Sequence, residues 1–250
     1  MTSPLSAEVE VVVREQPEVE AAEIIAAALR EATAGRGHFC LVLSGGRAPR
    51  PLFRRLARPP YCDQLAWGAV HFFWSDERCV PPDHEDSNYR MAKELLLDQL
   101  PLMPARVHRM MGELEPGAAA EACTDELAMF REHDHPWPVF DMMLMGLGED
   151  GHTASLFPGP ISPKELTRPV MAVSAERADK PHARLTLTPL SMNTARHILF
   201  LVTGEAKAEA VRGSLNARGQ SERWPAQRLQ PAAGRLTWLL DPAAASLLAG

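Results

Sequence analysis

The chain has 250 residues, of which 46% are hydrophobic and 23% are charged, and its formal net charge is −6. This balance is typical of a globular protein with a substantial core, and the length suits one α/β domain, so we expect a single domain over residues 1–250. No cluster of Lys and Arg is dense enough to follow a nucleic-acid backbone or an anionic membrane surface, which argues against nucleic acid and membrane as partners.

Short apolar runs alternate with helical patterns along the chain, which predicts parallel strands joined by crossover helices. The expected strands cover residues 9–13, 38–43, 70–74, 140–145, 184–188 and 197–203. One expected helix begins at Pro17, and the others cover residues 49–57, 88–100, 118–132 and 205–215. Pro-rich polar segments predict surface loops at residues 58–63, 79–86 and 133–138. The fold class is therefore α/β, with a mostly parallel sheet.

The first turn with chemical character follows the strand at residues 38–43. Ser44, Gly45 and Gly46 precede a helix that begins at Pro49, so bare backbone N–H groups converge near a helix N-terminus. Such an arrangement binds phosphate, and the carboxyl ends of parallel strands are where ligand crevices form. The alternative is that the two glycines only make a tight turn.

Charged loops follow two other strands. Residues 75–78 read Ser-Asp-Glu-Arg, and the guanidinium of Arg78 can hold a phosphate through two parallel hydrogen bonds. Lys207 stands in the first turn of a helix, where a cation opposes the helix dipole unless an anion binds there. The alternatives are a solvated charge cluster at residues 75–78 and a lysine stem lying over apolar surface.

The loop after residues 140–145 is the most specific segment of the sequence. Residues 146–155 read Gly-Leu-Gly-Glu-Asp-Gly-His-Thr-Ala-Ser, and the glycines allow a sharp turn that presents His152 to a ligand. Histidine can take a proton near neutral pH. Arg184 begins the strand at residues 184–188 and adds a further cation, unless it is a solvated arginine on an edge strand.

The N-terminus and the cysteines favour the cytoplasm. Residues 1–13 lack the basic and apolar segments of a signal peptide, and no stretch approaches the roughly 18 apolar residues of a membrane span. The cysteines form no C-x-x-C pair and are expected to be reduced thiols; they are Cys40, Cys62, Cys79 and Cys123. We expect a cytoplasmic protein that is a monomer or a weak homo-oligomer.

Together these segments resemble the 6-phosphogluconolactonase family. The matching motifs are Ser44-Gly45-Gly46, residues 75–78 with Ser87-Asn88, residues 146–159, residues 184–188, and residues 204–207. The resemblance implies a modified Rossmann-like three-layer sandwich, with a mostly parallel central sheet flanked by helices, and no metal or organic cofactor. It also implies a sugar-phosphate lactone as substrate, 6-phospho-D-glucono-1,5-lactone, hydrolysed to 6-phosphogluconate in the oxidative pentose phosphate pathway.

The same resemblance implies roles for individual residues. His152 would be the general base, with Asp150 orienting it, while Arg78, Lys207 and the Gly45-Gly46 backbone would bind the 6-phosphate. The supporting polar groups would be Ser44, Asn88 and Arg184. A δ-lactone is an activated ester, so a neutral histidine can activate a water and later return the proton to the ring oxygen.

One position departs from the family pattern. The family has Ser or Thr followed by Pro after the glycines, whereas this chain has Ala48-Pro49. The missing hydroxyl predicts a loss of about 1 kcal/mol of helix capping, or of one phosphate contact. Arg47 or Arg50 is the candidate replacement.

The nearest alternative is an amino-sugar-phosphate isomerase of the glucosamine-6-phosphate deaminase type, which shares the fold and a similar Asp-Gly-His turn. That family continues with Asn-Glu-Pro, whereas this chain continues with Ser155-Leu156-Phe157-Pro158. It also has an aromatic residue at the position of Arg78. Both differences argue against the ring-opening chemistry.

Two further alternatives belong to other classes. A non-catalytic sugar-phosphate sensor would need a DNA-binding module, and none can be placed before Val9 or after Leu248 without consuming the expected core. A metallohydrolase would need ligands such as those at residues 84–86 or 133–135, where no third ligand follows at a recognisable spacing. We expect no metal. The other histidines, including His38, His71 and His197, are expected to be structural.

Overall fold

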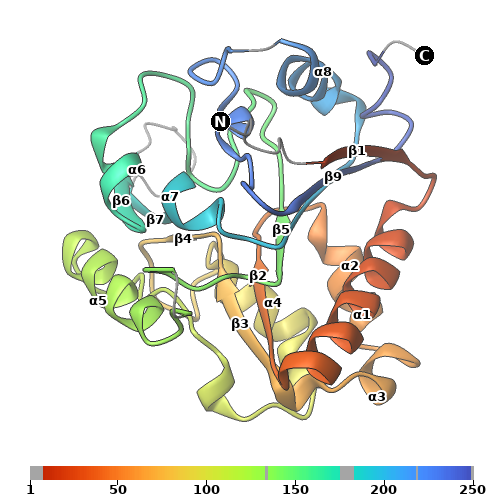
Figure 1. Ribbon diagram of the computed structural model, residues 1–250, viewed down its shortest axis with the longest axis vertical. Coiled ribbons are helices and arrows are strands. Elements are labelled where there is room, and N and C mark those ends of the chain that lie inside the picture. The colour runs from red at the N-terminus through yellow and green to blue at the C-terminus, as the bar shows by residue number, and fades with distance from the viewer. Residues whose placement is uncertain (1–7, 133–134, 175–182, 218, 249–250) are drawn as a thin grey trace, which may run out of the picture.

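The computed structural model describes residues 8–132, 135–174, 183–217 and 219–248. Six parallel strands form the central sheet, in the order β1-β9-β8-β5-β2-β3 (Figure 1). Their bounds are β1 (Glu8–Val13), β2 (Phe39–Leu43), β3 (Val70–Trp74), β5 (Met142–Met145), β8 (His197–Val202) and β9 (Arg235–Leu240). The predicted α/β class with a mostly parallel sheet is therefore confirmed.

Most of the α-helices begin with proline. The first N–H groups of a helix have no partner within the helix, so proline, which has no N–H, is well suited to this position. They are α1 (Pro17–Arg36), α2 (Pro49–Leu56), α3 (Tyr61–Gln64), α4 (Asn88–Leu95), α5 (Pro116–Ala128), α6 (Pro163–Thr167), α7 (Pro189–Met192) and α8 (Ala208–Asn216). Short 3₁₀ turns cover Trp67–Ala69, Leu97–Gln99, Pro104–Arg106, Glu205–Lys207 and Pro225–Arg228. None of the helices in the described ranges combines the length and the apolar character that a membrane crossing requires.

The central sheet has a hydrophobic core on each face, as β2 illustrates. Alternate side chains of a strand point to opposite faces, so Phe39 and Leu41 pack with residues of α1, α2 and α4. Cys40 and Val42 pack on the other side with residues of α5, α8 and β7. All five residues of β2 are buried, which explains why its sequence is a continuous apolar run.

A second, antiparallel sheet of three strands, in the order β4-β7-β6, was not predicted from the sequence. Its strands are β4 (Asp76–Arg78), β6 (Val170–Ser174) and β7 (Ala183–Leu187). The prediction that residues 75–78 form a loop is wrong. Ser75 alone separates β3 from β4, and it bonds to both sides, because its N–H donates to Leu43 at 2.9 Å and its C=O accepts from Leu187 at 2.9 Å. The chain thus passes from one sheet into the other without a turn.

Strand β9 was also not predicted from the sequence, and the other differences are local. The helix expected at residues 88–100 ends at Leu95 and continues as a 3₁₀ turn, and the helix expected at residues 205–215 likewise begins with the 3₁₀ turn Glu205–Lys207. The loop expected at residues 58–63 contains the start of α3. Helix and strand ends are the positions where pattern alone is least decisive, because the last turn of a helix often tightens.

The topology marks one place on the sheet edge. From β2 the chain moves outward to β3, and it then returns to the other side of β2 to form β5, β8 and β9. The direction of winding therefore reverses between β2 and β5. At such a reversal the loops leaving the two neighbouring strands diverge and open a crevice at their carboxyl ends.

Candidate active site

A cleft of about 930 Å³ lies at this reversal point. Its walls come from the segments that follow β2, β5 and β8, together with residues of β4 and β7. All of the site residues predicted from the sequence line it except Asp150: Ser44, Gly45, Gly46, Arg78, Asn88, His152, Arg184 and Lys207. Segments separated by more than half of the chain therefore meet in one cleft.

The Ser44-Gly45-Gly46 turn requires glycine for two different reasons. A Cβ on Gly45 would lie 1.9 Å from the side-chain oxygen of Asn88, so no larger residue fits against Asn88. Gly46 has a φ of 91°, in the left-handed region that favours glycine. The turn thereby brings bare backbone to the wall of the cleft.

Of the two consequences expected from Ala48, the structure argues against the loss of helix capping. Ala48 precedes α2 with helical dihedrals, φ −58° and ψ −39°, whereas a capping side chain works from an extended backbone. A hydroxyl at this position would therefore add little capping, but Ala48 lines the cleft, where it would add a polar group. Arg47 also lines the cleft, whereas Arg50 is not part of its wall.

His152 and Asp150 form a hydrogen-bonded pair. Nδ1 of His152 lies 2.5 Å from Oδ1 of Asp150, which also accepts the His152 backbone N–H at 3.2 Å. Because a carboxylate only accepts, Nδ1 carries the hydrogen and Nε2 keeps the lone pair in the neutral ring. A Cβ on Gly148 would lie 2.1 Å from this ring, so glycine is needed there. The ring is partly exposed to the cleft and can act as a base.

Two arginines occupy paired positions on neighbouring strands of the antiparallel sheet. Arg78 on β4 and Arg184 on β7 are cross-strand partners, and both line the cleft. Arg184 is buried, with its guanidinium 5.8 Å from the centre of the Phe157 ring. Since β7 is the middle strand of its sheet, the alternative of a solvated edge arginine is wrong. Like charges directly opposite each other are unfavourable, which an anionic ligand between them would offset.

Arg78 is held in place through its neighbour Glu77. The buried carboxylate of Glu77 accepts the backbone N–H groups of Arg78, Asn88 and Tyr89 at 2.7, 2.8 and 2.8 Å, and the hydroxyl of Ser87 at 3.0 Å. Burial raises the pKa of the Glu77 carboxyl, and the three N–H groups oppose part of that rise. Glu77 thus stabilises the start of α4 and does not face the cleft.

Asp76 and Ser155 were not identified from the sequence as site residues. Oδ2 of Asp76 accepts the hydroxyl of Ser155 at 2.8 Å and lies 3.9 Å from the guanidinium of Arg184. Oδ1 of Asp76 accepts the side-chain N–H of Asn88 at 3.2 Å, and Asp76 lines the cleft. The only signal in the sequence was the place of both residues in the same motifs as Arg78 and His152.

Lys207 lies on the far wall of the cleft, in the 3₁₀ turn before α8. Its Nζ lies 3.9 Å from a carboxylate oxygen of Glu149, in the loop that carries His152. The turn is anchored by Gly204, whose N–H donates to the carboxylate of Asp241 at 3.0 and 2.9 Å. Gly204 has a φ of 96°, which glycine adopts without strain.

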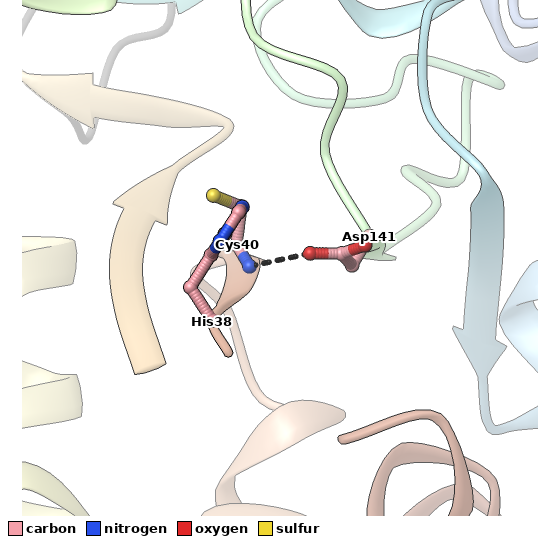
Figure 2. Close-up of side chains that lie close together, drawn as sticks. All are labelled: His38, Cys40 and Asp141. Carbon is pink, nitrogen blue, oxygen red and sulfur yellow. Dashed lines mark hydrogen bonds between the residues drawn. The ribbon is translucent and has the colours of Figure 1, made fainter. Parts of the chain in front are cut away.

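A cluster of potential metal ligands lies at the opposite edge of the central sheet. Figure 2 shows His38, Cys40 and Asp141, with the hydrogen bond of 2.8 Å from the Cys40 N–H to Asp141. The Asp141 carboxylate is already paired with Arg36 and with Arg196. Burial and, secondarily, Asp141 raise the pKa of the Cys40 thiol to about 12. A protonated thiol beside a neutralised carboxylate is a poor set of metal ligands.

The metal-ligand candidates considered from the sequence are at residues 84–86 and 133–135. In the ranges that the structure describes, no group of three such side chains forms around residues 84–86, where Nδ1 of His84 accepts the backbone N–H of Asp86 at 3.1 Å. His133 and Asp134 lie outside the described residues.

Known proteins are similar to this chain over most of its length. The family described as glucosamine-6-phosphate isomerases/6-phosphogluconolactonase matches residues 14–238. The 6-phosphogluconolactonase of Synechocystis sp. is 38% identical over 241 residues, covering 95% of this chain and 96% of its own length. That of Haemophilus influenzae is 36% identical over 206 residues, covering 82% of this chain and 86% of its own.

A solved structure extends the comparison to three dimensions. The 6-phosphogluconolactonase of Trypanosoma brucei superposes with a TM-score of 0.83 at 30% identity, covering 97% of this chain and 99% of that one. The match is therefore one of whole chains and not of an isolated motif. By sequence and by fold, the chain belongs to the enzyme family of the glucosamine-6-phosphate isomerases and 6-phosphogluconolactonases.

Proposed function

We propose that the protein hydrolyses 6-phospho-D-glucono-1,5-lactone to 6-phosphogluconate. The observation that carries this proposal is the presence, in one cleft, of a histidine oriented by a carboxylate and of cations that suit a phosphate. The relatives named 6-phosphogluconolactonase support the choice of substrate. The enzyme class is then a carboxylic ester hydrolase that acts on a sugar-phosphate lactone.

In the proposed mechanism, Nε2 of His152 takes a proton from a water whose oxygen attacks the lactone carbonyl. The Asp150 carboxylate holds the ring in the required tautomer and stabilises the imidazolium that forms. When the tetrahedral intermediate collapses, the bond from the carbonyl carbon to the ring oxygen breaks, and the imidazolium gives its proton to that oxygen. One water is consumed, and a carboxylic acid and a hydroxyl are formed.

The other end of the substrate would be held by charge. The Gly45-Gly46 backbone, Arg78 and Lys207 would bind the 6-phosphate, and Arg184 would add positive charge from the adjacent strand. Arg47 would take the place of the hydroxyl that Ala48 lacks. Ser44 and Asn88 would be supporting groups; Asn88 donates to Asp76 and abuts Gly45, which suits a role in shaping the turn.

The deaminase alternative remains testable within the same family. It would require the ring-opening carboxylate of the Asn-Glu-Pro motif, whose place is taken here by Ser155-Leu156-Phe157. Ser155 is buried and bonded to Asp76, so this segment is committed to an internal contact. We therefore favour the lactonase.

The deciding experiment measures hydrolysis of freshly generated 6-phosphogluconolactone, coupled to 6-phosphogluconate dehydrogenase, with the spontaneous rate subtracted. We expect a rate far above the blank that falls by about 10²-fold or more in His152→Ala, the loss typical of a missing general base. Release of ammonia from glucosamine 6-phosphate is assayed in parallel. A rate equal to the blank would contradict the proposal, and ammonia release would establish the alternative.

We further propose the cytoplasm as the site of action. The cysteines considered above are unbridged in the structure, as suits a reducing compartment. Fractionation of the source cells, with the activity followed in each fraction, tests this assignment.

A further inference from the structure

The carboxylate of Asp76 lies where the two sheets join. It is 5% exposed, and each of its oxygens accepts a hydrogen bond from a different segment, Ser155 at 2.8 Å and Asn88 at 3.2 Å. The Asp76 backbone C=O accepts a second bond from the Asn88 amide at 2.8 Å. The side-chain nitrogen of Asn88 thus donates to two oxygens of Asp76, which fixes the amide with its nitrogen towards Asp76.

Ser155 connects Asp76 to the loop of the proposed base. It follows His152 by three positions, and its backbone N–H donates to the hydroxyl oxygen of Thr186 at 3.2 Å. Thr186 is the cross-strand partner of Asp76, so two adjacent residues of the small sheet hold Ser155 by its hydroxyl and by its backbone. Between Ser155 and His152, Ala154 has a φ of 48°, a left-handed conformation that a non-glycine residue keeps only when its surroundings impose it.

The other contacts of Asp76 reach the anion-binding side of the cleft. Asn88 abuts Gly45 of the Ser-Gly-Gly turn, and the guanidinium of Arg184 lies 3.9 Å from Oδ2 of Asp76. The buried carboxylate of Asp76 therefore contacts the loop of His152 through Ser155 and the Ser-Gly-Gly turn through Asn88, and it lies close to Arg184.

We infer that Asp76 is the positioning residue that fixes the His152 loop relative to the anion-binding side of the cleft, acting on the base through Ser155. This inference rests on the proposed function, because it assigns the two ends of the cleft to the lactone and to the phosphate. A near-attack geometry needs both ends at a fixed separation, and a displacement of about 1 Å can reduce the rate by about 10²-fold. Asp76 takes no part in proton transfer in this scheme, because both of its oxygens accept hydrogen bonds from structural partners.

Removal of the Asp76 charge should lower kcat without weakening the binding of an anion. A carboxylate beside Arg184 lowers the positive potential that an anion meets, so removing the charge leaves anion binding equal or stronger. A positioning role and an anion-binding role are thus separable. Loss of a positioning role lowers kcat, whereas loss of an anion-binding role would weaken the affinity for a phosphorylated ligand.

The test uses the full chain with Asp76→Asn, which is isosteric but places an N–H₂ group against the Ser155 hydroxyl or the Asn88 amide. We expect kcat to fall by about 10²-fold, with the Kd for 6-phosphogluconate unchanged or lower and the pH dependence of kcat keeping its wild-type midpoint. Ser155→Ala should lower kcat as well, and the double variant should be no slower than Asp76→Asn alone, because both act through one bond.

Asp141→Asn is the matched control, because Asp141 is a buried carboxylate paired with Arg36 and Arg196 at the opposite edge of the central sheet, and it does not line the cleft. It should lower the thermal midpoint and leave kcat unchanged. An unchanged kcat in both Asp76→Asn and Ser155→Ala, a weaker Kd that accounts for the loss, or a shifted pH midpoint in Asp76→Asn would each overturn the inference.

Failure of the proposed function would be recognised separately, by a wild-type rate equal to the blank. The ring signals of His152 in NMR spectra then supply a readout that needs no turnover. We expect them to shift and broaden in Asp76→Asn and in Ser155→Ala, but not in Asp141→Asn. Identical His152 signals in wild type and both variants would overturn the positioning role.

Discussion

Arg78 and Arg184 stand directly opposite each other on neighbouring antiparallel strands, at the wall of the cleft. Like charges at paired positions of two strands are unfavourable, and an anion that binds both guanidiniums offsets this. We predict that Arg184→Met weakens 6-phosphogluconate binding by about tenfold or more, equivalent to about 1.4 kcal/mol, and lowers the thermal midpoint of the ligand-free protein, because the buried Asp76 carboxylate loses a neighbouring cation. Calorimetric titration and thermal unfolding with and without 6-phosphogluconate measure both quantities. Equal binding by the variant and the wild type would contradict the role of this pair.

Asp150→Asn tests the orientation of the base. The amide keeps the shape of the carboxylate but favours the wrong tautomer of His152, so kcat should fall by between about 10² and 10⁴-fold, with a small change in KM. Glu149→Gln alters the adjacent carboxylate, which lies 3.9 Å from Lys207, and should change KM more than kcat. Steady-state kinetics of the two variants distinguish the roles, and a kcat of Asp150→Asn within a few fold of wild type would argue against Asp150 as the orienting group.

Ala48→Ser tests the missing hydroxyl. Because the backbone of Ala48 is helical, the new side chain is poorly placed to cap α2, and the thermal midpoint should not change. Because Ala48 lines the cleft, the hydroxyl should add a contact to the phosphate and tighten the binding of 6-phosphogluconate. The same titration and melting experiments report on both, and a stabilised protein with unaltered affinity would show the reverse of our assignment.

His71 and His197 predict acid sensitivity of the fold. Burial lowers the pKa of each from 6.5 to about 4, with the charge of Arg106 adding to the effect on His71 and that of Arg235 on His197. The unfolded chain therefore binds more protons between pH 6.5 and 4, so this contribution to stability is complete above pH 6.5 and is lost as the pH falls towards 4.

His71 also has a geometric reason to resist protonation. Its Nε2 accepts from Arg106, which cannot lose its hydrogens, and its Nδ1 bonds to Nε2 of His108 at 2.8 Å. We predict that His71→Gln loses less stability than wild type when the pH is lowered from 7 to 4.5, as measured by urea unfolding. His135→Gln, at an exposed position, is the control and should follow the wild-type curve. Parallel curves for all three proteins would contradict this account.

The sequence was sufficient to predict those residues of the candidate site that belong to short, continuous motifs. The Ser-Gly-Gly turn and the loop of His152 each follow a continuous apolar run, so the strand and the turn could be recognised together. Asp76 could not be recognised as a shared contact, because its partners Ser155 and Arg184 are distant in the chain and meet it only through the register of β4 and β7.

The small sheet was missed for a related reason. The three residues of β4, Asp-Glu-Arg, have little intrinsic preference for a strand, and they adopt one because β7 supplies the backbone partners. The buried position of Arg184 follows from the same pairing. In the central sheet, by contrast, both faces of each inner strand are covered, and the resulting apolar runs made β2, β5 and β8 predictable.

The position of β9 between β8 and β1 bears on how the protein is made. Every described residue that lines the cleft precedes Arg235, so a chain whose translation stopped just before β9 would still contain all of these residues. In that chain, β1 would have no neighbour in the central sheet, and the buried strand β8 would present an open edge to solvent. Premature termination late in translation would therefore yield an aggregation-prone fragment, although no cleft residue is missing.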